Sequence, residues 1–552
     1  MKRNTLTTAV LAGLTGIAGM ASVANAVNVN PDGLGQVLLF PYYTARGGNN
    51  TLISIVNTTE RGKAVKIRFI EAINSREVLD FNIYMSPFDV WTTAILPTPE
   101  GGAKMLTTDT TCTVPYIFGD RNGEQEFLTF EFSGALANRD GGPTGVERTA
   151  SGYIEVIEMG TMVEDTGFRP GAGGFLDRTD PRIIPWASKH VNGVPRNCDL
   201  LVDYWTVGFG LPWTTGLLGG ANFGFDEAGA SGGLFGSGSI VNVRQGTMVS
   251  YNATAVDGFW NRGTTRHTQP DSLLPNLSDG NNRESFVFNN GALERDVWVA
   301  SLFALNATLT LDRLFNEYVT SDELEARTEW VLTFPTKRFH TDERLAGVTA
   351  NNPIPPFTRT MHKIITAQGW VSTNLACEDM EFRFWDREER EPAPGVDRPI
   401  VSPPPPETAR QQLQLCREAN VVRFASNGAV PDASEIMAEP RTWAGAAGVV
   451  GPAASVGDRL GYTNLGLPYD AGWLRFDLGA VPDDSPVCAV GGVCDRLTAA
   501  PSDRGRLARG LPVIGFQATT IQNGQLASGV LSNYGASFNH RGSRVFTSVT
   551  AQ

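Results

Sequence analysis

Apolar and polar residues alternate over short segments along much of the chain. Val65, Ile67 and Phe69, for example, alternate with basic residues, as expected for a strand with one face covered by a second sheet. Turn residues separate these segments, and no alternating βαβ units occur. The segments predicted as strands near the N-terminus are 36–45, 51–57, 63–73, 77–86 and 126–132. The pattern predicts an all-β, mainly antiparallel fold that begins with an immunoglobulin-like β-sandwich.

A change in composition divides the chain into two β-rich parts. Glycine dominates residues 216–238, which is typical of a long loop or connector. We therefore predict an N-terminal sandwich over 27–215, a connector over 216–238 and a second β-rich domain over 239–552. No repeat of fixed period is present.

The second domain contains a predicted helical insertion at about 293–328. Leu311, Leu314 and Tyr318 fall at helical spacing, and residues 321–325 resemble a capped helix start. A strand is predicted from Trp330 to Phe334. Residues 386–410 are charged and proline-rich, which favours an exposed, stiff loop.

The first 26 residues have the three parts of a secretory signal peptide. Lys2 and Arg3 precede an apolar stretch, and Ala24–Ala26 forms a small-x-small cleavage site. No later run of about 18 apolar residues follows, so no transmembrane helix is predicted in the mature chain. The sequence therefore predicts export to the cell surface or the extracellular space, with the periplasm as an alternative.

Six cysteines in an exported chain favour disulfides. Six cysteines allow fifteen pairings, and sequential pairing closes each loop within one region. The pairs predicted in this way are Cys112–Cys198, Cys377–Cys416 and Cys488–Cys494. The cysteines lack the spacing of zinc or haem sites.

Charge and motifs narrow the classes of function. The formal net charge of −13 argues against nucleic-acid partners and against docking by charge on anionic lipid. The chain has no Walker loop, dinucleotide fingerprint or His-Glu-x-x-His motif, and we expect no cofactor. Glycans and other surface proteins are the expected partners, and the oligomeric state stays open.

One tract formally fits the Gly-x-Ser-x-Gly pattern of a nucleophile elbow, with Ser231 at its centre. Such an elbow needs a strand before the serine and a helix after it, and neither is predicted inside this glycine-rich tract. Nothing in the sequence selects a base, and the histidines considered are His267, His340, His362 and His540. A match by composition is the favoured interpretation.

Two further groups of polar residues suggest binding or hydrolysis. Glu155 and Glu158 lie in an apolar strand, but a spacing of three places them on opposite faces, so salt bridges are favoured over a shared catalytic site. Trp473, Arg475 and Asp477 share a strand face, for which surface packing of the tryptophan beside an Arg–Asp pair is favoured over the binding of sugar rings. A groove formed by Trp473 or by Trp205, Trp213 and Trp260 would favour carbohydrate binding or hydrolysis.

The segment from Asp120 to Glu126 gathers oxygen ligands in a predicted turn. Calcium needs six to eight well-placed oxygens, and the distal glutamate of a calcium loop is missing. A hairpin turn is therefore favoured over a calcium site. We assign no catalytic residue and no metal ligand from the sequence.

Several strings resemble those of uncharacterised exported proteins of Gram-negative bacteria, some of them described as cell-surface proteins. They span most of the mature chain and cover residues 35–43, 74–81, 86–91, 316–319 and 330–337. The resemblance implies a location outside the cytosol, and it implies no activity or site residues. The sequence thus predicts a structural or adhesive surface protein. Two alternatives remain, a carbohydrate-binding protein or hydrolase and a subunit of a surface fibre or layer.

Overall fold

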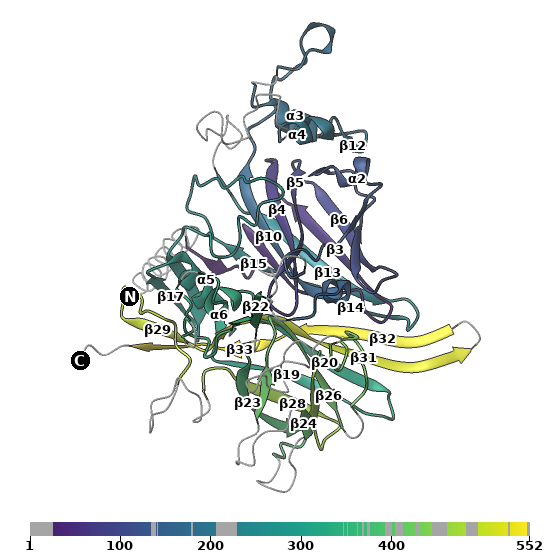
Figure 1. Cartoon of the computed structure of the whole chain (residues 1–552), viewed down its shortest axis with the longest axis vertical. Coiled ribbons are helices and arrows are strands. Elements are labelled where there is room, and N and C mark those ends of the chain that lie inside the picture. The colour runs from purple at the N-terminus through teal and green to yellow at the C-terminus, as the bar shows by residue number, and fades with distance from the viewer. Residues whose placement is uncertain are drawn as a thin grey trace, which may run out of the picture.

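The computed structural model consists of two β-sandwiches that pack against each other (Figure 1). It describes residues 26–548 apart from 134–139, 141, 178–179, 206–228, 346, 350–351, 362, 367–368, 373–375, 392–399, 403–411, 427–429, 444–460, 482–494 and 528–529. The prediction of an all-β, mainly antiparallel fold is confirmed. Its immunoglobulin-like detail stays a prediction.

The first sandwich has a seven-stranded and a six-stranded sheet. The seven-stranded sheet runs in the order β1 (Asn28–Val29), β15 (Thr254–Asp257), β2 (Val37–Thr44), β10 (Ser151–Thr161), β4 (Lys63–Glu71), β5 (Glu77–Met85) and β8 (Cys112–Val114). The six-stranded sheet runs in the order β14 (Thr247–Asn252), β13 (Leu234–Asn242), β3 (Asn49–Asn57), β6 (Val90–Pro97), β7 (Ala103–Leu106) and β9 (Glu124–Glu126). The predicted alternation of Val65, Ile67 and Phe69 places these side chains in the core between the sheets.

The second sandwich has a six-stranded and a five-stranded sheet. The first contains β24 (Ile400–Ser402), β27 (Thr463–Gly466), β26 (Ala419–Ala425), β20 (Ala326–Thr333), β31 (Ile514–Ala527) and β32 (Val530–Asn539). The second contains β25 (Gln412–Leu415), β23 (Glu378–Asp386), β28 (Ala471–Asp477), β19 (Arg313–Val319) and β33 (Arg541–Ser543). β26 and β27 run parallel, and the other pairs within these two sheets run antiparallel.

Shorter elements cover the sheets. The helical ones are α2 (Ile117–Asp120), η2 (Val146–Ala150), η3 (Ala172–Gly174), α3 (Ile183–Ser188), α4 (Cys198–Asp203), α5 (Ser301–Leu309) and α6 (Arg338–Thr341). The paired short strands are β11 (His190–Val191) with β12 (Val194–Pro195), β16 (Glu284–Asn289) with β17 (Ala292–Val297), β18 (Thr310–Leu311) with β30 (Leu511–Pro512), β21 (Lys363–Thr366) with β22 (Gly369–Ser372), and β29 (Arg506–Arg509) with β34 (Val545–Ser548). Among the described residues, none of the helices has the length and apolar character needed to cross a bilayer.

The second β-rich part contains a small helical element, but the predicted bounds of about 293–328 are too wide. Within these bounds only α5 is helical, and the chain continues through the short strand β18 into β19. Leu314 and Tyr318 were predicted to share a helix face, and both lie in the core from a strand. A spacing of four fits the period of two as well as that of 3.6, so these positions do not distinguish the two structures. Residues 322–325 form a turn before β20, not a helix.

The predicted strand over 126–132 is also wrong. β9 ends at Glu126, and the chain then turns, with the Phe132 amide donating to the Thr129 carbonyl at 3.1 Å. Phe127 and Phe132 are buried, whereas Leu128 and Phe130 are exposed. The alternation in this segment therefore does not belong to a paired strand.

The predicted domain boundary does not separate the two sandwiches. β13 overlaps the end of the predicted connector, and β14 and β15 follow it. Nevertheless, β13 pairs with β3 and with β14, and β15 pairs with β2, so all three belong to the first sandwich. The connector itself lies outside the described residues over 216–228, and its last residues from Leu234 belong to β13. Most of the predicted loop over 386–410 is outside the described residues too, except for an exposed turn after β23 and for β24.

β20 is buried on both faces because it lies between the two sandwiches. Trp330 and Leu332 lie in the core of the second sandwich. Val331 points the other way and packs in the core that the first sandwich shares with the junction. The Tyr251 ring stacks on Phe516 across this junction, with centroids 4.7 Å apart. The edge strands β14 and β32 also contact each other, and the Asn533 amide of β32 donates to the Gln245 carbonyl at 2.5 Å. The hairpin β31–β32 therefore runs along the junction (Figure 1).

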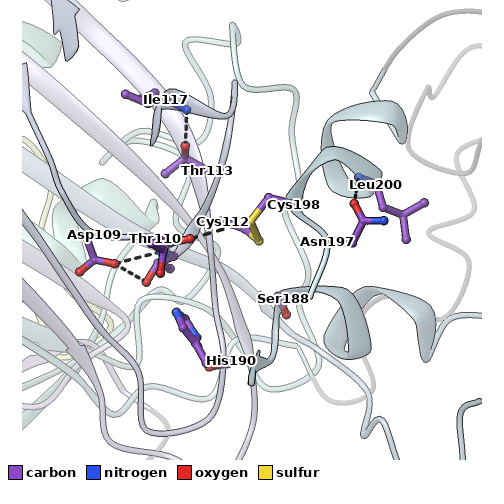
Figure 2. Close-up of a disulfide and its surroundings, with 12 residues drawn as sticks. Asp109, Thr110, Cys112, Thr113, Ile117, Ser188, His190, Asn197, Cys198 and Leu200 are labelled. Carbon is purple, nitrogen blue, oxygen red and sulfur yellow. Dashed lines mark hydrogen bonds between the residues drawn. A yellow bond between two sulfur atoms is a disulfide. The ribbon is translucent and has the colours of Figure 1, made fainter. Parts of the chain in front are cut away.

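Two of the three predicted disulfides are confirmed, Cys112–Cys198 and Cys377–Cys416. Cys488 and Cys494 lie outside the described residues. Figure 2 shows that the first disulfide joins β8 to the start of α4, close to His190 and Asp109. Asn197 caps α4 by accepting from the Leu200 amide at 3.1 Å. Disulfides of this kind are typical of an oxidising environment outside the cytosol.

Two buried carboxyl groups at the junction contribute a stabilisation that is lost as the pH rises. Burial raises the pKa of Glu418 to about 8 and that of Glu329 to about 7. The folded chain therefore keeps protons that the unfolded chain releases above its ordinary glutamate pKa. We expect the contribution of these two carboxyl groups to the free energy of unfolding to be lost as the pH rises from about 5 to 8, with Glu418 contributing on the order of 1–3 kcal/mol.

Urea unfolding of the wild type and of Glu418→Gln at the two ends of this range measures the effect. Glu418→Gln should remove the Glu418 part of the pH dependence, whereas Glu323→Gln in an exposed turn should leave the pH dependence unchanged. If the unfolding free energy depended on pH in the same way in Glu418→Gln and in the wild type, Glu418 would not hold the proton.

Candidate functional site

The outward face of the five-stranded sheet carries a row of aromatic and charged side chains. Leu474 and Phe476 of β28 are fully buried, and the alternation places Trp473, Arg475 and Asp477 on the other side. These three residues therefore share one face of the strand, as predicted. Trp385 of β23 lies directly across from Trp473.

Two tryptophans form the centre of this face. The Trp385 and Trp473 rings stack with centroids 4.2 Å apart and an interplanar angle of 15°. The guanidinium groups of Arg383 and Arg475 lie 5.2 Å and 5.8 Å from the Trp385 ring, within the range of a cation–π contact. Trp473 nevertheless keeps 40 % of its surface exposed. One face of its ring is covered by Trp385, so the remaining surface is free for a ligand.

Trp473 lines a hollow of about 330 Å³ between β28, β19 and the C-terminal end of β32. This volume falls within the range of small-ligand sites. The residues around the hollow, which we call the Trp473 hollow, are Phe315, Asn316, Glu317, Trp473, Phe538, Asn539 and Arg541. Three of them are aromatic, and Phe538 is 58 % exposed.

The polar groups of the Trp473 hollow differ in their bonding. The Asn316 amide donates to the Phe538 carbonyl at 3.2 Å and lies 3.2 Å from Nδ1 of His540, which fixes the hairpin to β19. By contrast, the carboxylate of Glu317 and the guanidinium of Arg541 make no ion pair or side-chain hydrogen bond within the described part of the chain. The hollow thus combines aromatic surface with one free acceptor group and one free donor group.

This combination suits a ligand that has both apolar faces and hydroxyl groups. Aromatic rings offer a large apolar surface, and charged side chains make the stronger hydrogen bonds. A pyranose ring has both properties. A glycosidase would need two carboxyl groups on either side of the bond that it cleaves, and Glu317 supplies the only carboxyl group among the residues that line the hollow.

Ser231 does not lie in a nucleophile elbow. The strand β13, not a helix, follows it. Its hydroxyl lies 2.9 Å from Lys63 Nζ and 3.1 Å from the Thr161 hydroxyl, and its backbone N–H donates to Glu158 at 3.0 Å. Because Lys63 is paired with Glu158 at 2.8 Å and both are fully buried, these bonds anchor the loop before β13.

The histidines considered as bases have other partners. Nε2 of His267 lies 2.8 Å from the Tyr84 hydroxyl, and that of His340 lies 2.7 Å from the Asn306 amide. Nε2 of His540 lies 3.0 Å from the Val331 carbonyl. Burial lowers the pKa of His267 to about 3 and that of His340 and His540 to about 4, so all three are neutral at pH 7. His362 lies outside the described residues.

Glu155 and Glu158 each pair with a separate cation of β4. Glu155 pairs with Arg68, and Glu158 pairs with Lys63. Burial raises the pKa of Glu155 against the opposing effect of Arg68. Both glutamates are therefore salt-bridged, which is the interpretation that the sequence favoured.

The segment from Asp120 to Glu126 comprises the end of α2, a turn and β9. Asn122 and Gly123 have φ values of 52° and 77° in this turn. Within the described residues, no group of three or more histidine, cysteine or acidic side chains is placed to hold a metal ion.

The other tryptophans considered from the sequence do not line the Trp473 hollow. Trp260 is buried and donates to the Glu158 carbonyl at 2.8 Å, and Trp205 donates to the Tyr84 hydroxyl at 3.0 Å. Trp213 lies outside the described residues. Sequence reasoning missed Trp385 and Phe538. The alternation of β23 contains a signal for Trp385, whereas the place of Phe538 depends on the path of the hairpin.

Comparison with models of protein families, with curated proteins and with solved structures finds no match to this chain.

Proposed function

We propose that the chain is an exported adhesive protein of the cell surface or extracellular space, and that it binds glycans in the Trp473 hollow. The observation that carries this proposal is the hollow itself, with three aromatic side chains beside Glu317 and Arg541, whose charged groups have no partner among the residues that the structure describes. The two disulfides and the predicted signal peptide support a location outside the cytosol.

The fold supports a binding role over a catalytic one. The aromatic face belongs to a sheet whose other side is fully packed, so the rings stand on a rigid support. The hollow is open and has no paired carboxyl groups or histidine base among its lining residues. A rigid, open aromatic surface binds sugar rings without the need to enclose them.

Replacing Trp473 by alanine is expected to weaken glycan binding by at least about ten-fold, because aromatic anchors carry much of the energy of such contacts. Affinity electrophoresis through gels that contain soluble polysaccharides, followed by titration with oligosaccharides of any polysaccharide that retards the chain, measures this effect. Glu317→Gln should weaken the same interaction through the loss of a charged acceptor.

Phe288→Ala serves as the matched control, since this ring is 71 % exposed on the separate β16–β17 hairpin. It should bind as the wild type does. Equal retardation of the wild type and Trp473→Ala in every gel, or no retardation of the wild type in any gel, would contradict the proposed function.

A further inference from the structure

A second cavity lies on the other sandwich, between the outward face of the seven-stranded sheet and the segments that cover it. It has a volume of about 420 Å³ and is bordered by β10, β4, the loop at Leu273, α5 and α6. Leu273 and Leu274 are 41 % and 45 % exposed, so they mark its mouth. We call this space the Arg338 cavity.

The walls of the Arg338 cavity are mostly apolar. Leucine, phenylalanine, isoleucine and proline side chains make up most of the lining, including Leu302 and Phe303 of α5 and Ile354. Its size and its apolar walls with few polar groups are those of a small-molecule site. An apolar ligand chain would therefore be stabilised here by the removal of its surface from water.

The charged groups of the cavity are concentrated in one part of its lining. Glu155 is bound to Arg68, and Nε of Arg68 also donates to Glu77 at 2.6 Å. These three groups satisfy one another and leave no free cation among them. Arg68 is shared by two carboxylates, and the charge of Arg338 also acts on Glu155.

Arg338 is bonded less completely. It donates from one terminal nitrogen to the Ser75 carbonyl at 2.8 Å. Its Nε is buried on the side of Asp342 and makes no hydrogen bond, and its second terminal nitrogen, Nη2, makes none within the described residues either but is not buried. The nearest carboxylate, Asp342, lies 3.9 Å away and is held by Arg344 at 3.0 Å and 3.1 Å. Of the residues that line the cavity, Arg338 is the one with a buried polar atom left unsatisfied in the described part of the chain.

The Nη2 group of Arg338 is left to donate to a ligand, and the planar guanidinium fork matches a carboxylate. We propose that the Arg338 cavity binds an amphipathic monocarboxylate, with the carboxylate on Arg338 and the hydrocarbon tail against the apolar walls. This site is separate from the Trp473 hollow and does not rest on the glycan proposal.

Titration calorimetry of the full mature chain with decanoate tests this assignment, and decanol serves as a probe with the same tail and no charge. We expect decanoate to bind at least about ten-fold more tightly than decanol, because a charged pair replaces an unsatisfied donor. Arg338→Met should remove this preference, and Arg338→Lys should restore it in part. Arg182→Met, which alters a partly exposed arginine paired with Asp180, is the matched control and should bind as the wild type does.

Leu302→Trp gives a second measurement, since the larger side chain fills the cavity and leaves Arg338 in place. It should abolish binding of both probes while glycan binding at the Trp473 hollow is unchanged. Decanoate binding that survives both Arg338→Met and Leu302→Trp, equal affinity for decanoate and decanol, or no binding to the wild type would overturn the proposal.

Discussion

Replacing Arg148 by methionine is expected to lower the free energy of unfolding by about 3–5 kcal/mol, the usual cost of removing one partner from a buried ion pair. Arg148 lies in η2 and is fully buried. It donates to Asp140 at 2.6 Å and 2.8 Å and to Glu71 at 2.9 Å. Methionine would leave both carboxylates without this cation inside the protein.

The titration of Asp140 explains why the cost is large. Burial on its own raises the pKa of Asp140, but Arg148, together with Arg76 and Asn74, outweighs burial and holds that pKa well below its ordinary value. A depressed carboxyl pKa stabilises the fold above the ordinary pKa of the group, and this stabilisation is lost as the pH falls through the depressed value. In Arg148→Met, burial would act on Asp140 without its main opposing charge.

Urea unfolding at neutral pH, followed by circular dichroism, measures the loss. Arg182→Met should leave the unfolding free energy almost unchanged, as expected for an exposed ion pair. If Arg148→Met changed the free energy of unfolding as little as Arg182→Met does, Asp140 and Glu71 would not depend on Arg148.

Removing the disulfide between Cys112 and Cys198 is expected to cost about 4–5 kcal/mol, as the loop-entropy model gives for a closed loop of this length. The two cysteines are 86 residues apart. The bond joins β8 to a small helical lobe whose α3 and α4 pack on Tyr84 and Met162. This cluster is separate from the main cores, so the lobe depends strongly on the covalent link.

The double variant Cys112→Ser with Cys198→Ser should therefore be cleaved first within the lobe. Limited proteolysis with mass spectrometry locates the cuts, and urea unfolding gives the energy. Removing Cys377 and Cys416, which are 39 residues apart, provides the comparison, with an expected loss of about 4 kcal/mol and no change in cleavage of the lobe. A lobe that resists the protease as well as the wild type does would contradict this role for the disulfide.

The sequence predicted correctly those strands that bury a single face. Val65 and Phe69 alternate with charged residues, and Leu474 and Phe476 alternate with Trp473, because one covered face imposes a period of two. The same reasoning failed at Leu314 and Tyr318, whose spacing fits a helix equally well. It also failed at Phe132, which is buried in a turn beneath Arg148, 4.3 Å from its guanidinium.

The sequence alone therefore determined the all-β class, the strands with one covered face and two of the disulfides, since local alternation and cysteine order carry that information. Only the tertiary structure decided that β13 to β15 complete the first sandwich, that β20 is buried on both faces, and that Phe538 and Arg541 meet Trp473. These features depend on pairings between residues far apart in the chain. No local pattern specifies them, because they are selected by how the two sandwiches bury their remaining apolar surface.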